Sequence, residues 1–194
     1  MVSVIGLGGA GCNAVRHVMQ HNANLQIRFN YLFCNEPDFS LEKKHLPTNA
    51  NVIIVKDATK YDFSESKNIF FVIAGLAGRT GATASILADT LQKKGNTVFG
   101  VGIMPYDFEG TTEKAKHALK LLGEKTTATI VLQNQQIKEL YGKIPLIPAL
   151  QKANNVIAQI ISHNSSKKCW SIFFRYRLRR FVAKLNNPMV TFYK

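Results

Sequence analysis

The sequence reads Gly6-Leu7-Gly8-Gly9-Ala10-Gly11-Cys12-Asn13 directly after the apolar run Val2–Ile5, which places a glycine-rich turn at the end of a strand. A second such turn reads Ala74-Gly75-Leu76-Ala77-Gly78-Arg79-Thr80-Gly81 and follows the apolar run Ile69–Ile73. Glycine-rich turns let backbone N–H groups crowd around a phosphate, and the helix N-terminus behind the turn adds partial positive charge. Two such loops predict a nucleotide phosphate chain that is held from two sides.

Strands and helices are predicted to alternate along the chain. We expect strands at Val2–Gly6, Ile27–Cys34, Val52–Val55, Ile69–Ala74, Thr97–Ile103 and Thr127–Leu132, and helices at Asn13–Gln20, Ala82–Lys94, Thr112–Leu122 and Pro148–Ile161. The fourth strand is almost wholly apolar, which is typical of a strand buried on both faces. The pattern predicts an α/β fold, a Rossmann-like parallel sheet with helices on both faces and ligands at the carboxyl ends of the strands.

The composition is that of a globular chain. It has 194 residues, of which 46% are hydrophobic, enough for one domain with a core. No apolar run approaches the roughly 20 residues that span a bilayer, and the N-terminus lacks a signal-type core. The cysteines Cys12, Cys34 and Cys169 are too widely spaced for a disulfide framework, and His17 and His21 lack an evident third metal ligand. We therefore expect a cytoplasmic protein without a metal site of its own.

The net charge of +13 is concentrated at the C-terminal end. Residues 1–162 carry 17 basic and 12 acidic side chains, whereas residues 163–194 carry 8 basic side chains and no acidic one. The last acidic residue of the chain is Glu139. This break predicts a domain over residues 1–161 and a basic, aromatic tail over residues 162–194, either disordered or forming a single helix.

Three interpretations of this tail stay open. As a helix it would place Phe174, Leu178, Phe181, Val182 and Leu185 on one side, which is typical of a basic helix lying on anionic lipid. Basic residues interleaved with aromatic ones also suit nucleic acid, the less favoured partner. The third interpretation is that the tail is not an evolved segment but the product of a frameshift or a shortened gene copy.

The first loop alone allows a dinucleotide-binding protein. Gly6-x-Gly8-x-x-Gly11 matches the dinucleotide fingerprint, and Glu36 follows the second predicted strand where a ribose-binding acid would sit. An NAD-type protein does not need the second glycine–threonine loop, however, and the five histidines offer no evident hydride-transfer site. A tight turn that only packs the first helix is the remaining alternative.

Five segments, in chain order, resemble the FtsZ and tubulin family over roughly residues 1–161. The first loop resembles the family's GxGGxGxN element, and Ala74–Thr83 resembles its AGMGGGTGTG signature. Met104–Gly110 resembles the RPFxFEG segment, Val131–Asn134 stands at the IPN segment, and Ala149–Val156 resembles the AFKxANDVL stretch of the central helix. Five landmarks at plausible spacings are more specific than a lone glycine motif.

The resemblance implies GTP or GDP as the ligand, with Mg²⁺ as an optional companion ion. The implied binding residues are Gly8, Gly9, Ala10, Gly11, Cys12, Asn13, Gly78, Arg79, Thr80, Gly81, Glu109, Asn134 and Asn155. In this assignment the first loop holds the α- and β-phosphates, the second loop faces the β/γ end, and Glu109 accepts hydrogen bonds from the ribose. Asn155 stands where the family has the aspartate that reads guanine, so the charge-assisted part of that bond is lost.

Two of these residues, Cys12 and Glu109, have alternative interpretations. One substitution is expected to separate nucleotide binding from folding. Cys12 is either a small buried residue or a thiol of lowered pKa beside the phosphates. The turn at Glu109 is either a ribose site or a helix cap. Gly11→Val is expected to fill the phosphate space and abolish binding with little change in the fold.

Departures from the family pattern bear on activity. Ala77, Arg79 and Thr83 replace family glycines, and Arg79 can instead donate to a phosphate. The stretch Asn35–Ile69 is too short for the family's further γ-phosphate loop, and Glu113 replaces the arginine after the FEG turn.

The family's acidic loop, which polarises water in the neighbouring subunit, and its second domain have no counterpart after residue 161. No catalytic residue is therefore assigned. The resemblance predicts a GTP-binding cell-division protein, a filament subunit or modulator that does not hydrolyse GTP by itself, with copies of itself or full-length FtsZ as partners.

Overall fold

Apolar runs of the chain pair into one sheet, in which strands buried on both faces form the centre. The computed structural model describes residues 2–21, 27–33, 51–54, 68–142, 145–165 and 174–193. The strands are β1 (Val2–Leu7), β2 (Ile27–Phe33), β3 (Asn51–Ile54), β4 (Ile69–Gly75), β5 (Thr97–Met104), β6 (Ala128–Gln133) and β7 (Val190–Phe192), in the order β3-β2-β1-β4-β5-β6-β7. All neighbours pair in parallel except β6 and β7, which are antiparallel.

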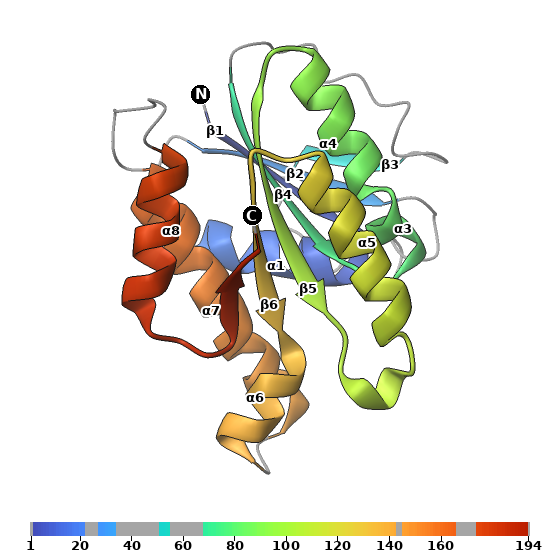
Figure 1. Ribbon diagram of the computed structural model, residues 1–194, viewed down its shortest axis with the longest axis vertical. Coiled ribbons are helices and arrows are strands. Elements are labelled where there is room, and N and C mark those ends of the chain that lie inside the picture. Colours follow the sequence, from blue (N-terminus) through green and yellow to red (C-terminus); the bar gives the residue numbers. More distant parts are fainter. Residues whose placement is uncertain are drawn as a thin grey trace.

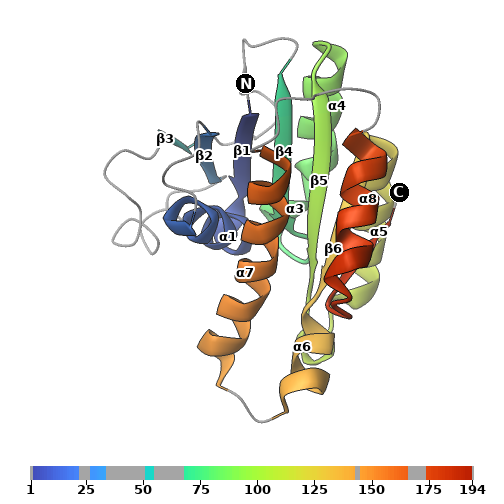
Figure 2. The same cartoon turned by 90° about the vertical axis from the view of Figure 1, so that its left-hand side faces the viewer.

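Helices cover both faces of the sheet. They are α1 (Gly8–His21), α3 (Arg79–Ala82), α4 (Ala84–Lys93), α5 (Thr112–Glu124), α6 (Asn134–Tyr141), α7 (Leu146–Ser165) and α8 (Phe174–Leu185), with a short 3₁₀ turn, η3 (Asp107–Glu109). Helices α1, α7 and α8 lie on one face and α4 and α5 on the other (Figure 1; Figure 2). Each face has its own apolar core, and both cores use side chains of β1, β4 and β5.

The order of the strands places a ligand crevice between β1 and β4. From β1 the chain runs outward through β2 to β3, then returns to the other side of β1 and continues through β4 and β5 to β6. The connections that leave β1 and β4 therefore lead to opposite faces, and the crevice opens where they part. Both glycine-rich loops begin at this point.

The predicted α/β architecture is confirmed, with local differences. Helix α1 begins at Gly8 rather than at Asn13, because the first glycine loop itself forms the opening turn. The helix predicted from Ala82 is interrupted at Thr83, whose hydroxyl donates to the carbonyl oxygen of Thr80 at 2.7 Å. Helix α6 was not predicted. The predicted strand ends at Cys34 and Val55, the acid Glu36 and most of the stretch Asn35–Ile69 lie outside the described residues.

The C-terminal tail packs against the sheet. Helix α8 buries Leu178 and Val182, and Met189 beyond it is buried as well. Strand β7 pairs with β6, and the Gln133 N–H donates to the Met189 carbonyl at 2.8 Å just beyond the ladder. The sequence analysis expected at most a single helix here and did not predict the strand.

This packing bears on the interpretations of the tail. The side of α8 expected to lie on lipid faces the core instead, because Leu178 and Val182 are buried and Phe181 and Leu185 pack against the same cluster. The lipid interpretation of that side is therefore wrong for this fold. No described helix has both the length and the apolar character to cross a membrane.

We expect Leu178→Ala to lower the free energy of unfolding by about 2–5 kcal/mol, because it removes a fully buried side chain and leaves a cavity. Arg180→Ala on the exposed side of the same helix is the control and is expected to change it by less than about 0.5 kcal/mol. Urea unfolding of the full chain measures both. Equal midpoints for Leu178→Ala and the parent chain would show that α8 does not pack on the sheet.

Candidate functional site

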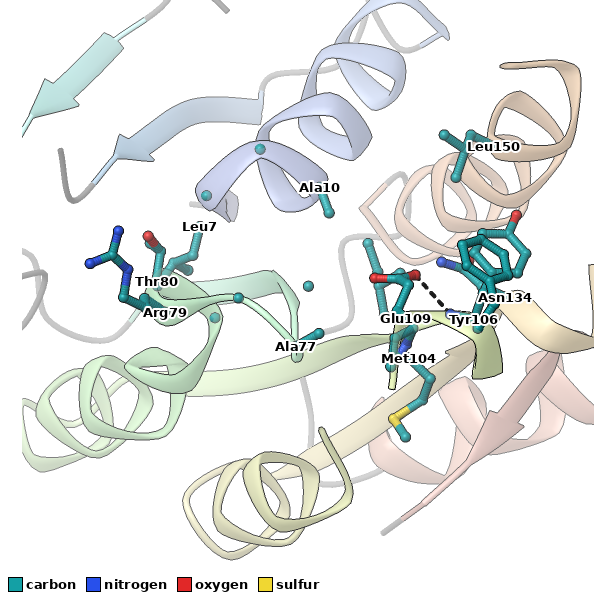
Figure 3. Close-up of a pocket in the computed structure, with 18 residues that line it drawn as sticks. Leu7, Ala10, Ala77, Arg79, Thr80, Met104, Tyr106, Glu109, Asn134 and Leu150 are labelled. Atoms are coloured by element: carbon teal, nitrogen blue, oxygen red, sulfur yellow. Dashed lines mark hydrogen bonds between the residues drawn. The ribbon is translucent and has the colours of Figure 1, made fainter. Parts of the chain in front are cut away.

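A cavity of about 560 Å³ lies at the carboxyl ends of the central strands. It is lined by the first loop (Leu7–Ala10), the second loop (Gly75 and Ala77–Gly81), the segment after β5 (Ile103–Tyr106, Phe108 and Glu109), and single residues of α6 and α7 (Asn134 and Leu150) (Figure 3). The crevice predicted from the strand order is thus a real cavity. Its two ends differ in chemistry.

Both loops pack closely against the end of β4 because each has a glycine at the point of contact. A Cβ atom on Gly11 would lie 2.3 Å from the carbonyl oxygen of Ile73, and one on Gly81 would lie 1.8 Å from the carbonyl oxygen of Gly75. No side chain fits at such distances from backbone atoms. These two glycines are therefore required for the loops to pack, whatever the cavity binds.

Two other glycines face open space. A Cβ atom on Gly9 would meet nothing within 4 Å, and one on Gly78 would have only the Gly75 carbonyl oxygen in range, at 3.7 Å. Both residues line the cavity, Gly9 in the first turn of α1 and Gly78 just before α3. Their backbones can therefore be approached closely by a ligand.

The loop end of the cavity suits an anion. The first N–H groups of α1 have no acceptor within their own helix, and no acidic residue lies in its first turn. Arg79 is exposed and lines the cavity on the other loop, so its guanidinium is available to a phosphate or carboxylate. Thr80, whose side chain is buried, stands between them, and a Cβ atom on Gly8 would lie 3.2 Å from its Cβ atom. The two loops are in contact with each other.

The opposite end of the cavity is aromatic and apolar. The rings of Tyr106 and Phe108 are stacked with their centroids 5.2 Å apart and their planes 14° apart. Met104 and Leu150 also line this end, and Phe108 is 72% exposed. Stacked rings beside aliphatic side chains suit a flat aromatic group.

Glu109 connects the two parts of the segment after β5. Its carboxylate accepts a hydrogen bond from the Tyr106 N–H at 2.8 Å, while its own N–H donates to the Tyr106 carbonyl oxygen at 3.0 Å (Figure 3). Gly110 then ends the turn in the left-handed region, with φ at 65°. Glu109 is therefore a cap of η3, as one alternative predicted, and it also lines the cavity.

Two buried polar atoms at the aromatic end have no hydrogen-bond partner. They are the Tyr106 hydroxyl oxygen and the Asn134 side-chain carbonyl oxygen, on residues that are 6% and 7% exposed. Burial, and then the nearby Glu109 carboxylate, raise the pKa of the Tyr106 phenol. Buried polar groups are nearly always paired in folded proteins, so two unpaired ones beside a cavity point to a ligand.

The cavity brings together nine of the thirteen predicted site residues and leaves four outside. Those that line it are Gly8, Gly9, Ala10, Gly78, Arg79, Thr80, Gly81, Glu109 and Asn134. The ligand that they bind stays a prediction. Cys12 is outside because its thiol is buried and donates to the Gly6 carbonyl oxygen at 3.3 Å, as the buried alternative held.

The other three predicted residues lie outside the cavity lining for separate reasons. Gly11 packs on β4, so the expectation that Gly11→Val would leave the fold unchanged is wrong. Asn13 lines a separate hollow of about 290 Å³ between α1 and α7. Asn155 is exposed on α7, and its side-chain oxygen is hydrogen-bonded to His17 on α1 rather than turned to the cavity.

Sequence reasoning missed most of the aromatic end. Met104, Tyr106 and Phe108 lie in a segment in which only Glu109 was singled out, and Leu150 lies in the helix segment in which only Asn155 was. The available signal was two aromatic residues around an acidic one just after a buried strand. Among the described residues, no group of three histidine, cysteine or acidic side chains is placed to hold a metal ion.

Comparison with known proteins agrees with this geometry. A family model described as "Tubulin/FtsZ family, GTPase domain" matches residues 50–142. The chain is 24% identical to cell division protein FtsZ 1 of Pyrococcus woesei, over 82% of this chain and 49% of that protein. It is 26% identical to cell division protein FtsZ of Aquifex aeolicus, again over 82% and 49%. The chain spans about half the length of the curated relatives it matches.

Solved structures share the fold. An empty FtsZ dimer of M. jannaschii superposes with a TM-score of 0.69 at 17% identity, over 92% of this chain and 59% of that one. A GTPγS-bound protofilament of CetZ2 from Haloferax volcanii gives 0.69 at 16% identity, over 92% and 62%. The family model, the curated relatives and the solved structures all show that this chain is similar to proteins of the tubulin/FtsZ family.

Proposed function

We propose that the cavity binds a guanine nucleotide, GTP or GDP, with the phosphates on the glycine loops and the base at the aromatic end. One observation carries the proposal. Two loops interlock at the end of β4 through Gly11 and Gly81, while Gly9 and Gly78 leave their backbones open toward one cavity. A tight turn that only packs a helix needs the first pair of glycines but not the second.

Separate groups would hold each part of the nucleotide. The N-terminus of α1 and the Arg79 guanidinium supply positive charge at the phosphate end. Glu109 lines the cavity between the loops and the aromatic end, where its carboxylate can accept from ribose hydroxyls. Mg²⁺, where present, would be held through the phosphates, since the described residues provide no ready set of carboxylate ligands.

At the level of the cell, we propose a cytoplasmic cell-division protein that forms or modulates filaments. The similar curated proteins are named for cell division, and the similar CetZ2 structure is a protofilament. Copies of the same chain or full-length FtsZ are the proposed partners.

We further propose that the chain by itself does not hydrolyse GTP. Hydrolysis needs a group that orients the attacking water. Among the described residues that line the cavity, Glu109 is the acidic one; one of its carboxylate oxygens accepts the Tyr106 N–H bond, and in the proposed complex the carboxylate also accepts from the ribose hydroxyls. No acidic residue follows Glu139 in this sequence, so residues 140–194 supply none either.

Gly9→Val and Gly11→Val form a matched pair that separates binding from folding. We expect Gly9→Val to keep the thermal unfolding midpoint of the parent chain, since its side chain enters open space, and to weaken GDP binding about tenfold or more. Gly11→Val is expected to unfold the chain, because its side chain meets the Ile73 carbonyl oxygen.

Isothermal titration with GDP, GTP and NAD measures the binding, and thermal unfolding measures the fold. Unchanged GDP affinity in a folded Gly9→Val chain would place the ligand elsewhere. Binding of NAD in preference to both guanine nucleotides would assign the cavity to a dinucleotide instead.

For turnover, we expect phosphate release from GTP by the chain alone to stay at the background rate, because Glu109, the acidic residue among the described residues that line the cavity, is assigned to the η3 cap and the ribose and not to the attacking water. Loss of a group that positions the attacking water commonly lowers the rate of phosphoryl transfer by about a hundredfold or more. Release is followed with a coupled phosphate assay, with full-length FtsZ as the positive control. Steady release by the chain alone that Thr80→Ala abolishes would refute the proposed inactivity.

A further inference from the structure

Strand β7 is the last described strand of the sheet, and positive charge borders its outer edge. We propose that this edge is a docking surface for an extended acidic segment of another protein, which adds to β7 as a further strand. The surface shares no lining residue with the cavity, so the inference goes beyond the proposed nucleotide binding and does not depend on it.

The outer edge of β7 carries main-chain groups that β6 does not use. Two hydrogen bonds flank the β6–β7 ladder at 2.8 Å, from the Gln133 N–H to the Met189 carbonyl oxygen and from the Tyr193 N–H to the Thr129 carbonyl oxygen. Hydrogen-bonded pairs alternate with non-bonded pairs in an antiparallel ladder. Phe192, one residue before Tyr193, therefore turns its N–H and carbonyl away from β6, toward the side on which no described strand lies.

The features that usually protect an edge strand are few at β7. Edge strands are commonly protected by charged side chains, proline, a bulge or a covering helix. Strand β7 consists of Val190, Thr191 and Phe192, without charge or proline, and α8 and α5 lie on either side of it (Figure 1). Three residues offer few main-chain hydrogen bonds, so a partner also needs side-chain contacts.

A hollow beside β7 offers those contacts. It has a volume of about 420 Å³ and is lined by residues of α8, of β7 and of the turn between them. Among these residues, Val182 and Val190 are buried and apolar, whereas Arg179 is exposed. Alternate side chains of an added strand point to the α8 side, where the hollow lies. An apolar lining with a guanidinium beside it suits a side chain that ends in a carboxylate.

The charge of α8 favours an acidic partner. Arg179, Arg180 and Lys184 are exposed on this helix, and neither α8 nor β7 contains an acidic residue. No acidic residue follows Glu139 in the sequence. A surface of one sign attracts the opposite sign and rejects its own, so the edge is complementary to an acidic segment.

The α5 side of the edge adds little charge of either sign. Tyr193 lies against α5, since a Cβ atom on Gly123 would be 2.6 Å from its ring. The exposed charged side chains nearest to Gly123 within α5 are Lys120, one turn earlier, and Glu124, which follows it directly. Their charges offset each other, so the positive charge at the edge comes from α8.

Two other occupants fit these observations less well. A second copy of this chain would bring a second α8 of the same charge to the edge, and like charges repel. A layer of anionic lipid would meet the same cations but would leave the Phe192 N–H and carbonyl without a partner. An extended acidic peptide matches both the charge and the main-chain groups.

Fluorescence anisotropy of a labelled peptide, titrated with the full chain, tests the inference. The probe is a short capped peptide that alternates valine and glutamate, and its matched control alternates valine and lysine. We expect the glutamate peptide to bind at least about tenfold more tightly than the lysine peptide. Equal affinities, or no binding of the glutamate peptide, would overturn the inference and leave the proposed nucleotide binding standing.

A pair of substitutions at one position tests the main-chain pairing. Phe192→Pro and Phe192→Ala both remove the ring, but only the proline removes the N–H that faces the open edge, a place where an edge strand tolerates proline. We expect Phe192→Pro to bind the glutamate peptide at least about tenfold more weakly than Phe192→Ala. Equal affinities of the two folded variants would overturn the inference.

The peptide carries the same test if Phe192→Pro does not fold. Two forms of the glutamate peptide are N-methylated at every second residue, one at the glutamates and one at the valines, so that each loses the N–H donors of one edge. Because one edge of the peptide pairs with β7, we expect one form to bind at least about tenfold more weakly than the other. Equal affinities of the two forms would overturn the inference.

Charge reversal at the hollow tests the acidic character of the partner. Arg179→Glu is expected to weaken the glutamate peptide about tenfold or more, because it replaces the guanidinium beside the hollow by a like charge. The matched control is Lys114→Glu, the same change of sign on an exposed residue in the first turn of α5, outside the hollow, and it is expected to leave the affinity unchanged. Equal effects of the two reversals would overturn the inference. Thermal unfolding of each variant confirms that the chain is folded.

Sedimentation velocity and vesicle flotation test the other occupants. We expect Phe192→Pro to sediment as the parent chain does, and a self-associated species that this substitution dissolves would assign the edge to a second copy instead. Vesicles of phosphatidylserine and phosphatidylcholine are the lipid probe. Vesicle binding that Arg179→Glu abolishes, in a chain that does not bind the glutamate peptide, would assign the basic side of α8 to lipid and overturn the inference.

Discussion

Close contact between backbones at the end of β4 is the constraint on which the rest of the structure depends. Gly11 lies against the Ile73 carbonyl and Gly81 against the Gly75 carbonyl, both at distances that leave no space for a Cβ atom. These contacts bring the loops after β1 and β4 together at the point where the strand order reverses. The cavity exists because two loops that leave the sheet in opposite directions are held at one strand end.

The glycines of these loops consequently have two distinct tasks. Those that face β4 are needed for folding, and those that face the cavity leave room for a ligand. A glycine motif in a sequence does not distinguish the two, which explains why Gly11 was assigned to the phosphates. The cavity itself combines a cationic end at Arg79 with a stacked aromatic end at Tyr106 and Phe108, an arrangement that suits the proposed nucleotide.

Much of the fold could be predicted because its strands are long apolar runs between glycine-rich turns. Ile69–Gly75 is an example, since a strand buried on both faces has almost no polar residue. Strand β7 could not be predicted, because a strand of three residues is too short to show a periodic pattern. The packing of α8 was missed because the many basic side chains of the tail obscured the buried Leu178 and Val182. Among site residues, Asn155 was placed by family resemblance, which could not foresee its hydrogen bond to His17.

The central claim is that both glycine loops bind one nucleotide, and amide NMR spectra of the ¹⁵N-labelled full chain during a GDP titration test it most directly. The account predicts that the N–H signals of Gly8 and Gly9 in the first loop and of Gly78 and Thr80 in the second shift together, with one common dissociation constant. The buried Cys12 amide and the α8 signals serve as internal references. Shifts confined to one loop, or two loops that titrate with different constants, would contradict the claim.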